Sequence, residues 1–357
     1  MSKSTLQELL GLRLPVIQAP MAGSQDSALA LAVTNAGGLG SLPAATLGPA
    51  QLRAELELLS REAQGPWNVN FFCHRPPQAD AQREALWRAA LAPLCAEAGL
   101  PAPEGPAVAA RAPFDMAVAD LVEPFRPPVV SFHFGLPAPE LLERVKSWGS
   151  KVLSSATTVE EALWLQEHGA DAIIAQGLEA GGHRGIFLGD DLTTQLGTFA
   201  LLPQLVCAVE LPVIAAGGIA DAAGVAAARA LGASAVQVGT AYLLCPEAGT
   251  SALHRAALLS DAARHTALTN VFTGRPARGI VNRAMRALGA DGNLGSCISS
   301  RAPAFPLAST HLAPLRAWAE AQGRDDFTPL WAGQSAPLAR AMPAAELTYA
   351  LAEGWQD

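Results

Sequence analysis

Short apolar runs alternate with longer helical runs over the first 250 residues, and this alternation constrains the fold most strongly. The strand-like runs are PVIQAP (15–20), GLGSL (38–42), WNVNFF (67–72), VVSFHF (129–134), KVLSSA (151–156), DAIIAQ (171–176), PVIAAG (212–217) and AVQVG (235–239). Between them, residues 50–63, 138–148, 159–168 and 222–231 carry apolar residues at spacings of three and four, which is typical of helices. Eight such units predict an α/β chain folded as a (β/α)8 TIM barrel rather than an open sheet.

Two regions interrupt the alternation. Residues 99–128 are dense in Pro and Ala, so we expect an extended excursion after a long third helix. After about residue 250 the units stop, and residues 251–313 are polar and Gly-rich, with TGRPARG (273–279) and DGNLGS (291–296). We therefore expect a barrel over 1–250, a small second domain over 251–313 that caps the barrel mouth, and a helical segment over 314–357 that returns to the barrel. The amphipathic stretch LAPLRAWAEAQG (312–323) could supply the closing eighth helix, although a terminal helix with no functional role is the favoured interpretation.

Composition and charge exclude several classes of protein. The net charge is −8 and the basic residues are scattered, so we expect no nucleic acid partner. The five cysteines are odd in number and far apart, without metal-ligand spacing, which indicates a reducing cytoplasm and no metal site. The N-terminus lacks an apolar signal core, and polar residues and prolines break the most apolar stretch (199–216), so we expect no membrane span. The sequence leaves a homodimer open.

The run QGLEAGGHRG (176–185) places an imidazole directly after a glycine pair at a predicted strand end. Catalytic groups of α/β barrels gather at such ends. Gly181 and Gly182 lack Cβ atoms, so a flat ligand could lie against this backbone. An isolated Gly-Gly-His would more often be a turn with a surface histidine. The other motifs of the chain favour a ligand site with His183 in it.

Two glycine-bearing loops follow the last two predicted strands. Gly217 and Gly218 lie in IAAGGIAD (214–221), and Gly239 and Thr240 lie in GASAVQVGT (232–240). In barrels these two loops commonly hold a phosphate, because glycine amides and a helix N-terminus point together at an anion. The pair of loops predicts a phosphate-bearing ligand.

Further polar and small residues follow other predicted strands. Ala19, Pro20 and Met21 form a turn with little side-chain bulk, which suits the edge of a heterocycle. Asn70 and Gln176 can each donate and accept hydrogen bonds, as the pyrimidine-like edge of a flavin requires. His133 would more often be a satisfied core histidine, but its place at a strand end makes a functional role equally plausible.

Seven motifs in order carry a family resemblance. They are IQAPMAG (17–23), NVNFFCHRP (68–76), SFHFG (131–135), SSATTVEEA (154–162), DAIIAQGLEAGGHRG (171–185), PVIAAGGIAD (212–221) and GASAVQVGTAYLLCPEA (232–248). From about residue 13 to 350 the chain resembles the bacterial class I nitronate monooxygenases. The resemblance implies a TIM barrel with one FMN and a small domain over the flavin. It implies flavin contacts at Met21, Asn70, Gln176, Gly181, Gly218, Gln237, Gly239 and Thr240, to which the loop positions add Ala19, Pro20, Gly182, Gly217 and Val238.

The resemblance also implies a reaction. A small alkyl nitronate, such as propionate 3-nitronate, would be oxidised by dioxygen to a carbonyl compound without NAD(P)H, with His183 and His133 on the substrate side of the flavin. His183 could bind the anion when protonated or accept a proton when neutral. This chain departs from relatives that carry two tyrosines and a lysine, since Phe305, Ser309 and Ala313 stand there. We expect altered substrate selectivity from these three positions.

Other functions remain as alternatives. A flavin-dependent NAD(P)H reductase of a quinone or enoyl-thioester would share the GGH loop and the phosphate site. A Schiff-base aldolase needs a lysine at an inner strand end, but the three lysines lie elsewhere. In an inosinate dehydrogenase-type barrel the nucleophilic cysteine precedes the last phosphate glycines, whereas Cys297 follows them. No GxGxxG follows a strand, so a Rossmann site is unsupported. A catalytically silent binding protein is the last alternative.

Overall fold

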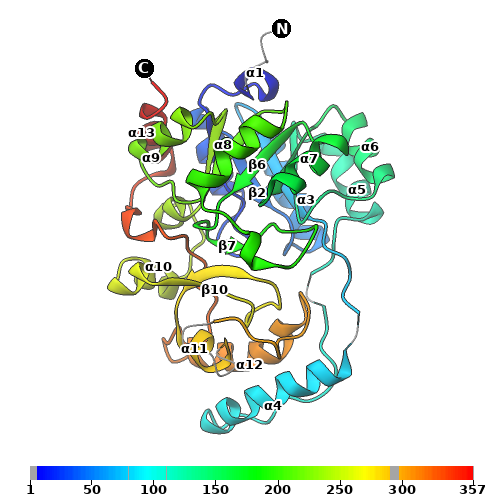
Figure 1. Cartoon of the computed structure of the whole chain (residues 1–357), viewed down its shortest axis with the longest axis vertical. Coiled ribbons are helices and arrows are strands. Elements are labelled where there is room, and N and C mark those ends of the chain that lie inside the picture. Colours follow the sequence, from blue (N-terminus) through cyan, green and yellow to red (C-terminus); the bar gives the residue numbers. More distant parts are fainter. Residues whose placement is uncertain (1–5, 79, 110, 290–296, 357) are drawn as a thin grey trace.

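The computed structural model describes residues 6–78, 80–109, 111–289 and 297–356, and it shows a barrel joined to a smaller cap (Figure 1). All eight predicted strands are present, and they form one parallel sheet in the order β1-β9-β8-β6-β5-β4-β3-β2. A parallel bridge between Ile17 and Leu39 brings the first and last strands of this order together. The predicted (β/α)8 barrel is therefore confirmed.

The strands of the barrel are β1 (Val16–Gln18), β2 (Gly40–Pro43), β3 (Trp67–Phe72), β4 (Val129–His133), β5 (Lys151–Ala156), β6 (Ala172–Gln176), β8 (Val213–Ala216) and β9 (Ala235–Val238). The helices that follow them in the chain or begin it are α1 (Leu6–Leu10), α2 (Ser27–Ala36), α3 (Pro49–Glu62), α4 (Ala81–Glu97), α5 (Met116–Val122), α6 (Pro139–Ser147), α7 (Val159–Glu167), α8 (Thr198–Ala208) and α9 (Ala222–Ala230). The remaining elements are β7 (Gly182–His183), α10 (Ala252–Leu258), β10 (Thr266–Thr269), β11 (Ala277–Ile280), α11 (Arg283–Gly289), α12 (Ala308–Glu320) and α13 (Ala344–Glu353), with short 3-10 helices η1 (Glu123–Phe125), η2 (Leu192–Thr194), η3 (Thr240–Leu244), η4 (Asp261–Arg264) and η5 (Ala336–Leu338).

Apolar side chains fill the barrel interior at the amino ends of its strands. Ile17, Leu153 and Ile214 are fully buried in one cluster, and Leu6 and Leu10 of α1 join that cluster. Burial of one such side chain stabilises the fold by about 1.5–3 kcal/mol. The amino ends of the strands therefore form a packed, mainly apolar layer.

The helix that completes the outer ring is α13, not the one predicted. α13 packs on α2, α9 and β1, whereas residues 312–323 fall largely in α12, which packs on α4. The prediction that this stretch supplies the closing eighth helix was wrong. Its amphipathic pattern is real, but its apolar face, including Leu312 and Leu315, is buried in the cap.

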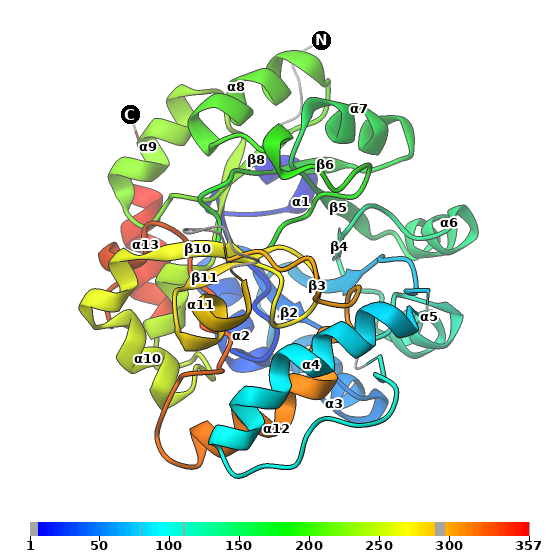
Figure 2. The ribbon, with the colours of Figure 1, turned by 60° about the horizontal axis from the view of Figure 1, so that its bottom comes forward.

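The long third helix α4 also lies in the cap. Trp87 of α4 is fully buried and donates from Nε1 to the carbonyl of Ala308, at the start of α12, over 3.2 Å. Figures 1 and 2 both show α4 beside α12, away from the barrel. The barrel position of a third helix is taken by α5, which contacts α3 and α6. The excursion over 99–128 is therefore extended only in part, because Asp115 caps α5 by accepting from the Val118 amide over 2.9 Å.

A three-stranded antiparallel sheet, β10-β11-β7, joins the cap to the barrel. Its last strand is the Gly182–His183 pair, so the GGH motif is itself part of the cap sheet. The stretch TGRPARG runs into β11, while DGNLGS lies outside the described residues. Within the described residues, no helix is both long and apolar enough to cross a lipid bilayer. The boundaries 1–250, 251–313 and 314–357 remain a proposal, and α4 and part of α12 are cap segments outside the predicted 251–313.

Candidate active site

A cavity lies where the carboxyl ends of the barrel strands meet the cap. Its empty volume is about 1380 Å³, its open mouth included. The predicted residues that line it are Ala19, Pro20, Met21, Asn70, His133, Gln176, Gly181, Gly182, His183, Gly217, Gly218, Gln237, Gly239 and Thr240. Val238 is the exception: its side chain is 1% exposed and packs in the apolar cluster outside the sheet. Only its backbone approaches the site, where its carbonyl accepts from the Ala19 amide over 2.8 Å.

The two glycine loops meet at one end of the cavity. Gly217 and Gly218 have φ values of 113° and 76°. Residues that carry a Cβ rarely adopt this region. The second loop leads from Gly239 into η3, whose first amides have no carbonyl one turn earlier to bond. The two loops follow neighbouring strands, β8 and β9, and both line the cavity.

A strap over residues 331–335 crosses these loops, and it was not among the predicted site residues. The Gly333 amide donates to Thr240 Oγ1 over 3.0 Å, and Ser335 Oγ donates to the Gly218 carbonyl over 2.6 Å. The Gln334 amide donates to the Glu179 carbonyl over 2.9 Å. The sequence WAGQS has one glycine and no strand pattern around it, so only its polar, small composition could have indicated a site.

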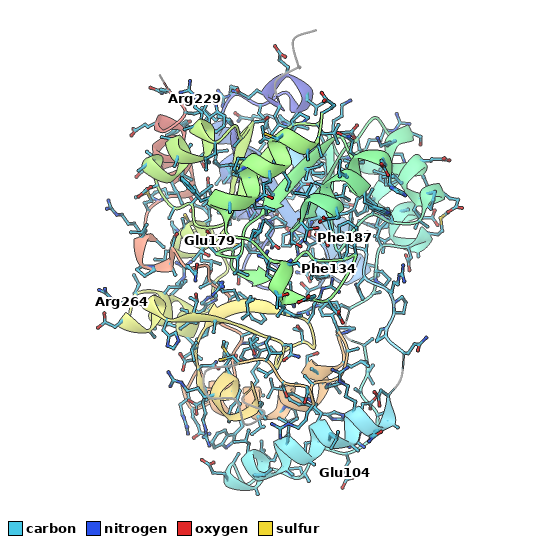
Figure 3. The ribbon with its side chains drawn as sticks, in the orientation of Figure 1. Glu104, Phe134, Glu179, Phe187, Arg229 and Arg264 are labelled. Carbon is cyan, nitrogen blue, oxygen red and sulfur yellow. The ribbon has the colours of Figure 1, made fainter. Side chains whose placement is uncertain are left out.

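Packing explains the glycine at position 181. A Cβ there would lie 2.6 Å from the carbonyl carbon of Ala332 and from the Gly333 nitrogen. Real Cβ atoms do not approach backbone atoms so closely, so a side chain would push the strap away. On the other side of this loop Glu179 accepts from the Thr198 amide over 2.8 Å at the start of α8. Figure 3 places Glu179 at the level where the barrel meets the cap.

Asn70 and Gln176 line the cavity but use their amide groups within the protein. Asn70 Nδ2 donates to Ser131 Oγ over 2.9 Å. Gln176 Nε2 donates to the His183 carbonyl over 2.9 Å, and Gln176 Oε1 accepts from the Gly185 amide over 2.7 Å. Gln176 therefore fixes the GGHRG loop on the barrel. The buried Arg184 adds to this by donating to the Gln176 carbonyl over 2.7 Å.

His183 projects from β7, whose pairing with β11 fixes its backbone. Its Nε2 lies 2.9 Å from Thr273 Oγ1, so the hydroxyl orients the ring. Burial lowers the pKa of His183 well below its ordinary 6.5, and the positive charge of Arg111 and the neighbouring His133 lower it further. The imidazole is therefore neutral near pH 7 and can accept a proton.

His133 is engaged at both ring nitrogens. Nε2 lies 3.1 Å from the His183 carbonyl, to which it must donate, and Nδ1 lies 3.0 Å from Ser155 Oγ, from which it then accepts. Burial lowers the pKa of His133 to about 3, against the opposing effect of the bond to the His183 carbonyl. This geometry makes His133 a residue that positions the His183 backbone. Ser131 and Ser155, which hold Asn70 and His133, also line the cavity.

Aromatic rings and guanidinium groups gather beside the cap side of the cavity, which Phe72 lines. Phe72, Phe134 and Phe305 pack as one cluster, and the Phe305 ring centre lies 5.4 Å from that of His183. The guanidinium carbon of Arg275 lies 3.9 Å from the centre of the Phe134 ring, which Figure 3 labels at the junction of barrel and cap. Arg111, from the linker between α4 and α5, also lines the cavity. Neither arginine could be singled out from the sequence, because the contacts that bring them here come from the cap.

Of the three departures noted in the sequence, only one lies beside His183. Phe305 is buried in the aromatic cluster. Ser309 donates to the Pro306 carbonyl over 3.0 Å within its own chain segment, and Ala313 lies on the exposed face of α12. Of these three positions, only Phe305 is placed to influence substrate selectivity, and the altered selectivity stays a prediction.

Comparisons with known proteins show the family of this chain. The family model described as "Nitronate monooxygenase" matches residues 3–354. A nitronate monooxygenase of Pseudomonas aeruginosa is 45% identical over 97% of each chain, and one of Paraburkholderia phytofirmans is 44% identical over 97% of this chain and 93% of its own. The crystal structure of nitroalkane oxidase from Streptomyces ansochromogenes is 37% identical, with a TM-score of 0.85 over 99% of both chains. FabK from Thermotoga maritima is 26% identical, with a TM-score of 0.72 over 99% of this chain and 96% of its own. The chain belongs to the nitronate monooxygenase family.

Proposed function

We propose that this chain binds FMN and oxidises small alkyl nitronates, such as propionate 3-nitronate, by dioxygen to carbonyl compounds without NAD(P)H. One observation carries the proposal: a single cavity is lined by the glycine loops after β8 and β9 at one end and by the neutral imidazole of His183 and the guanidinium of Arg111 at the other. A phosphate-bearing cofactor and an anionic substrate would require such a pair of ends.

The residues present fit a flavin mononucleotide. Gly217 and Gly218 have positive φ values and no Cβ, and the Gly239 loop faces Ala19 and Met21 without a Cβ between them. We propose that these two loops hold the phosphate, and that Asn70, Gln176 and Gln237 lie along the ring system. When bound, the flavin would supply one-electron oxidation of the nitronate; the protein supplies placement and charge.

His183 would serve as a proton acceptor rather than as the charge that binds the anion. Its pKa is lowered by burial, so at neutral pH it carries no positive charge. The Thr273 hydroxyl orients the His183 ring. Gln176 and His133 both donate hydrogen bonds to the His183 carbonyl. A neutral nitroalkane bound at this site could lose its acidic C–H proton to His183.

The cofactor is tested by heating the purified protein and identifying what is released. A yellow protein that releases FMN supports the proposal, and release of FAD or of no flavin contradicts it. The reaction is tested on an oxygen electrode with three additions to the same holoenzyme: a nitronate, the corresponding neutral nitroalkane, and NADH with a quinone. We expect oxygen uptake with the nitronate and no oxidation of NADH when NADH and a quinone are added.

The reductase alternative rests on the GGH loop and the two glycine loops, which a flavin-dependent NAD(P)H reductase would share. It predicts the reverse pattern: NADH is oxidised with a quinone or an enoyl-thioester, and the nitronate causes no oxygen uptake above background. The same oxygen and NADH measurements therefore separate the two functions.

A further inference from the structure

Arg111 faces the cavity with an unsatisfied guanidinium group. Its Nη1 atom is buried and has no hydrogen-bond partner among the described residues. Of the described residues that line the cavity, it is the only one with a permanent charge. A buried cation without a partner costs free energy, because the hydrogen bonds that it made to water are lost. An anionic ligand would recover that loss.

The position of Arg111 places it on the substrate side. Its guanidinium carbon lies 5.7 Å from the centre of the Phe305 ring, and that ring lies 5.4 Å from the ring of His183. The glycine loops that fit a phosphate come instead from β8 and β9, on the barrel. Arg111 and His183 therefore share one aromatic wall.

The other basic groups near this wall are not available for an anion in the same way. Arg275 also has a buried nitrogen without a partner, Nε, but its guanidinium lies over the Phe134 ring, donates from Nη2 to the Ile186 carbonyl and does not line the cavity. His183 is neutral near pH 7, because burial lowers its pKa. Burial, and the charge of Arg316, also lower the pKa of Arg111, but a guanidinium remains protonated at neutral pH in proteins.

We propose that Arg111 binds the two oxygens of the anionic nitro group and so makes the enzyme select the nitronate over the neutral nitroalkane. The inference rests on the proposed function for the identity of the substrate. The planar guanidinium fork matches a planar group with two oxygens, and a pair of parallel charge-assisted hydrogen bonds can form. Arg111 thus supplies the positive charge that binds the anion, because His183 is neutral near pH 7.

Steady-state kinetics test this with Arg111→Met, Arg111→Lys and the control Arg75→Met. Arg75 is exposed and also lies between β3 and α5, so its substitution removes one positive charge outside the cavity. For Arg111→Met we expect kcat/KM for a nitronate to fall roughly 10- to 100-fold, the usual effect of losing a hydrogen bond to a charged group. The loss should appear mainly in KM. Arg111→Lys should recover part of it, and Arg75→Met should change nothing.

A binding measurement tests the site without turnover. Nitrate is a planar oxyanion with the shape of the nitro group, and its affinity for the holoenzyme can be measured by calorimetry. We expect nitrate to bind the wild type and Arg75→Met alike, and Arg111→Met at least 10-fold more weakly. Equal nitrate binding by Arg111→Met, or none by the wild type, would overturn the proposal.

The two experiments also separate this inference from the proposed function. If the wild type consumes oxygen with nitronates while Arg111→Met matches it in KM and in nitrate affinity, the function stands and the role of Arg111 fails. If nitrate binding depends on Arg111 but no nitronate is oxidised, the anion site stands and the nitronate is the wrong ligand. If Arg111→Met does not fold, nitrate binding by Arg111→Lys is the test instead. An affinity of Arg111→Lys equal to that of the wild type would contradict the claim that the guanidinium binds the nitro group through two parallel hydrogen bonds.

Discussion

A methyl group at position 181 should disturb the site through the strap over residues 331–335. In Gly181→Ala the new Cβ would lie 2.6 Å from two backbone atoms, 0.8 Å inside the 3.4 Å at which ordinary contact begins. Neither Ala332 nor Gly333 can yield by rotating a side chain, so the strap must shift. Overpacking of this kind costs about 1–3 kcal/mol. If the bound state bears that strain, FMN affinity should fall roughly 5- to 150-fold.

Two further glycines calibrate the effect. A Cβ added at Gly189 would meet no atom within 4 Å, and the φ of Gly189 is ordinary, so Gly189→Ala should leave FMN affinity unchanged. A Cβ added at Gly218 would make only ordinary van der Waals contacts, but the φ of this residue is 76°. Gly218→Ala should therefore cost only the backbone strain, about 1–2 kcal/mol. FMN dissociation constants come from quenching of flavin fluorescence on titration with apoprotein. The packing argument fails if Gly181→Ala binds FMN as tightly as Gly189→Ala.

Three predictions concern the histidines. His183→Asn should keep FMN but lose about 100- to 10,000-fold in turnover of the neutral nitroalkane; retained turnover would return His183 to a structural role. His133→Asn should do less damage, which the same assay measures, because His133 only positions the His183 backbone. The lowered pKa values of His133 (about 3), His74 and His254 (both about 4) mean that unfolding takes up protons below pH 6.5. Unfolding free energy should therefore fall by about 1 kcal/mol per pH unit for each histidine between pH 6 and 4, and a urea midpoint independent of pH there would contradict this.

The sequence predicted the barrel well because its signals are local. Each strand is a short, β-branched run between turn residues, and a run such as DAIIAQ needs no knowledge of distant residues to be read. The ends of those strands then have to meet at one edge, which is why residues as far apart as Met21 and Thr240 could be assigned to one cavity.

The cap could not be predicted in the same way, because long-range packing decides it. α4 has the pattern of any amphipathic helix, and nothing in its sequence says that Trp87 packs on α12 instead of on the barrel. The same applies to Arg111 and to the strap over 331–335, whose places in the site follow from cap contacts. Val238 was misplaced for a simpler reason: successive residues of a strand face opposite sides, and its neighbour Gln237 takes the cavity side.

Electron transfer from the nitronate is the central claim, and an anaerobic titration measures it directly. Without oxygen, addition of a nitronate to the yellow holoenzyme should change the visible absorption of the bound flavin, while NADH should leave that absorption as it was. Readmission of air should restore the oxidised spectrum and yield the carbonyl product. If NADH bleaches the flavin and the nitronate does not, the chain is a reductase and the proposed function is wrong.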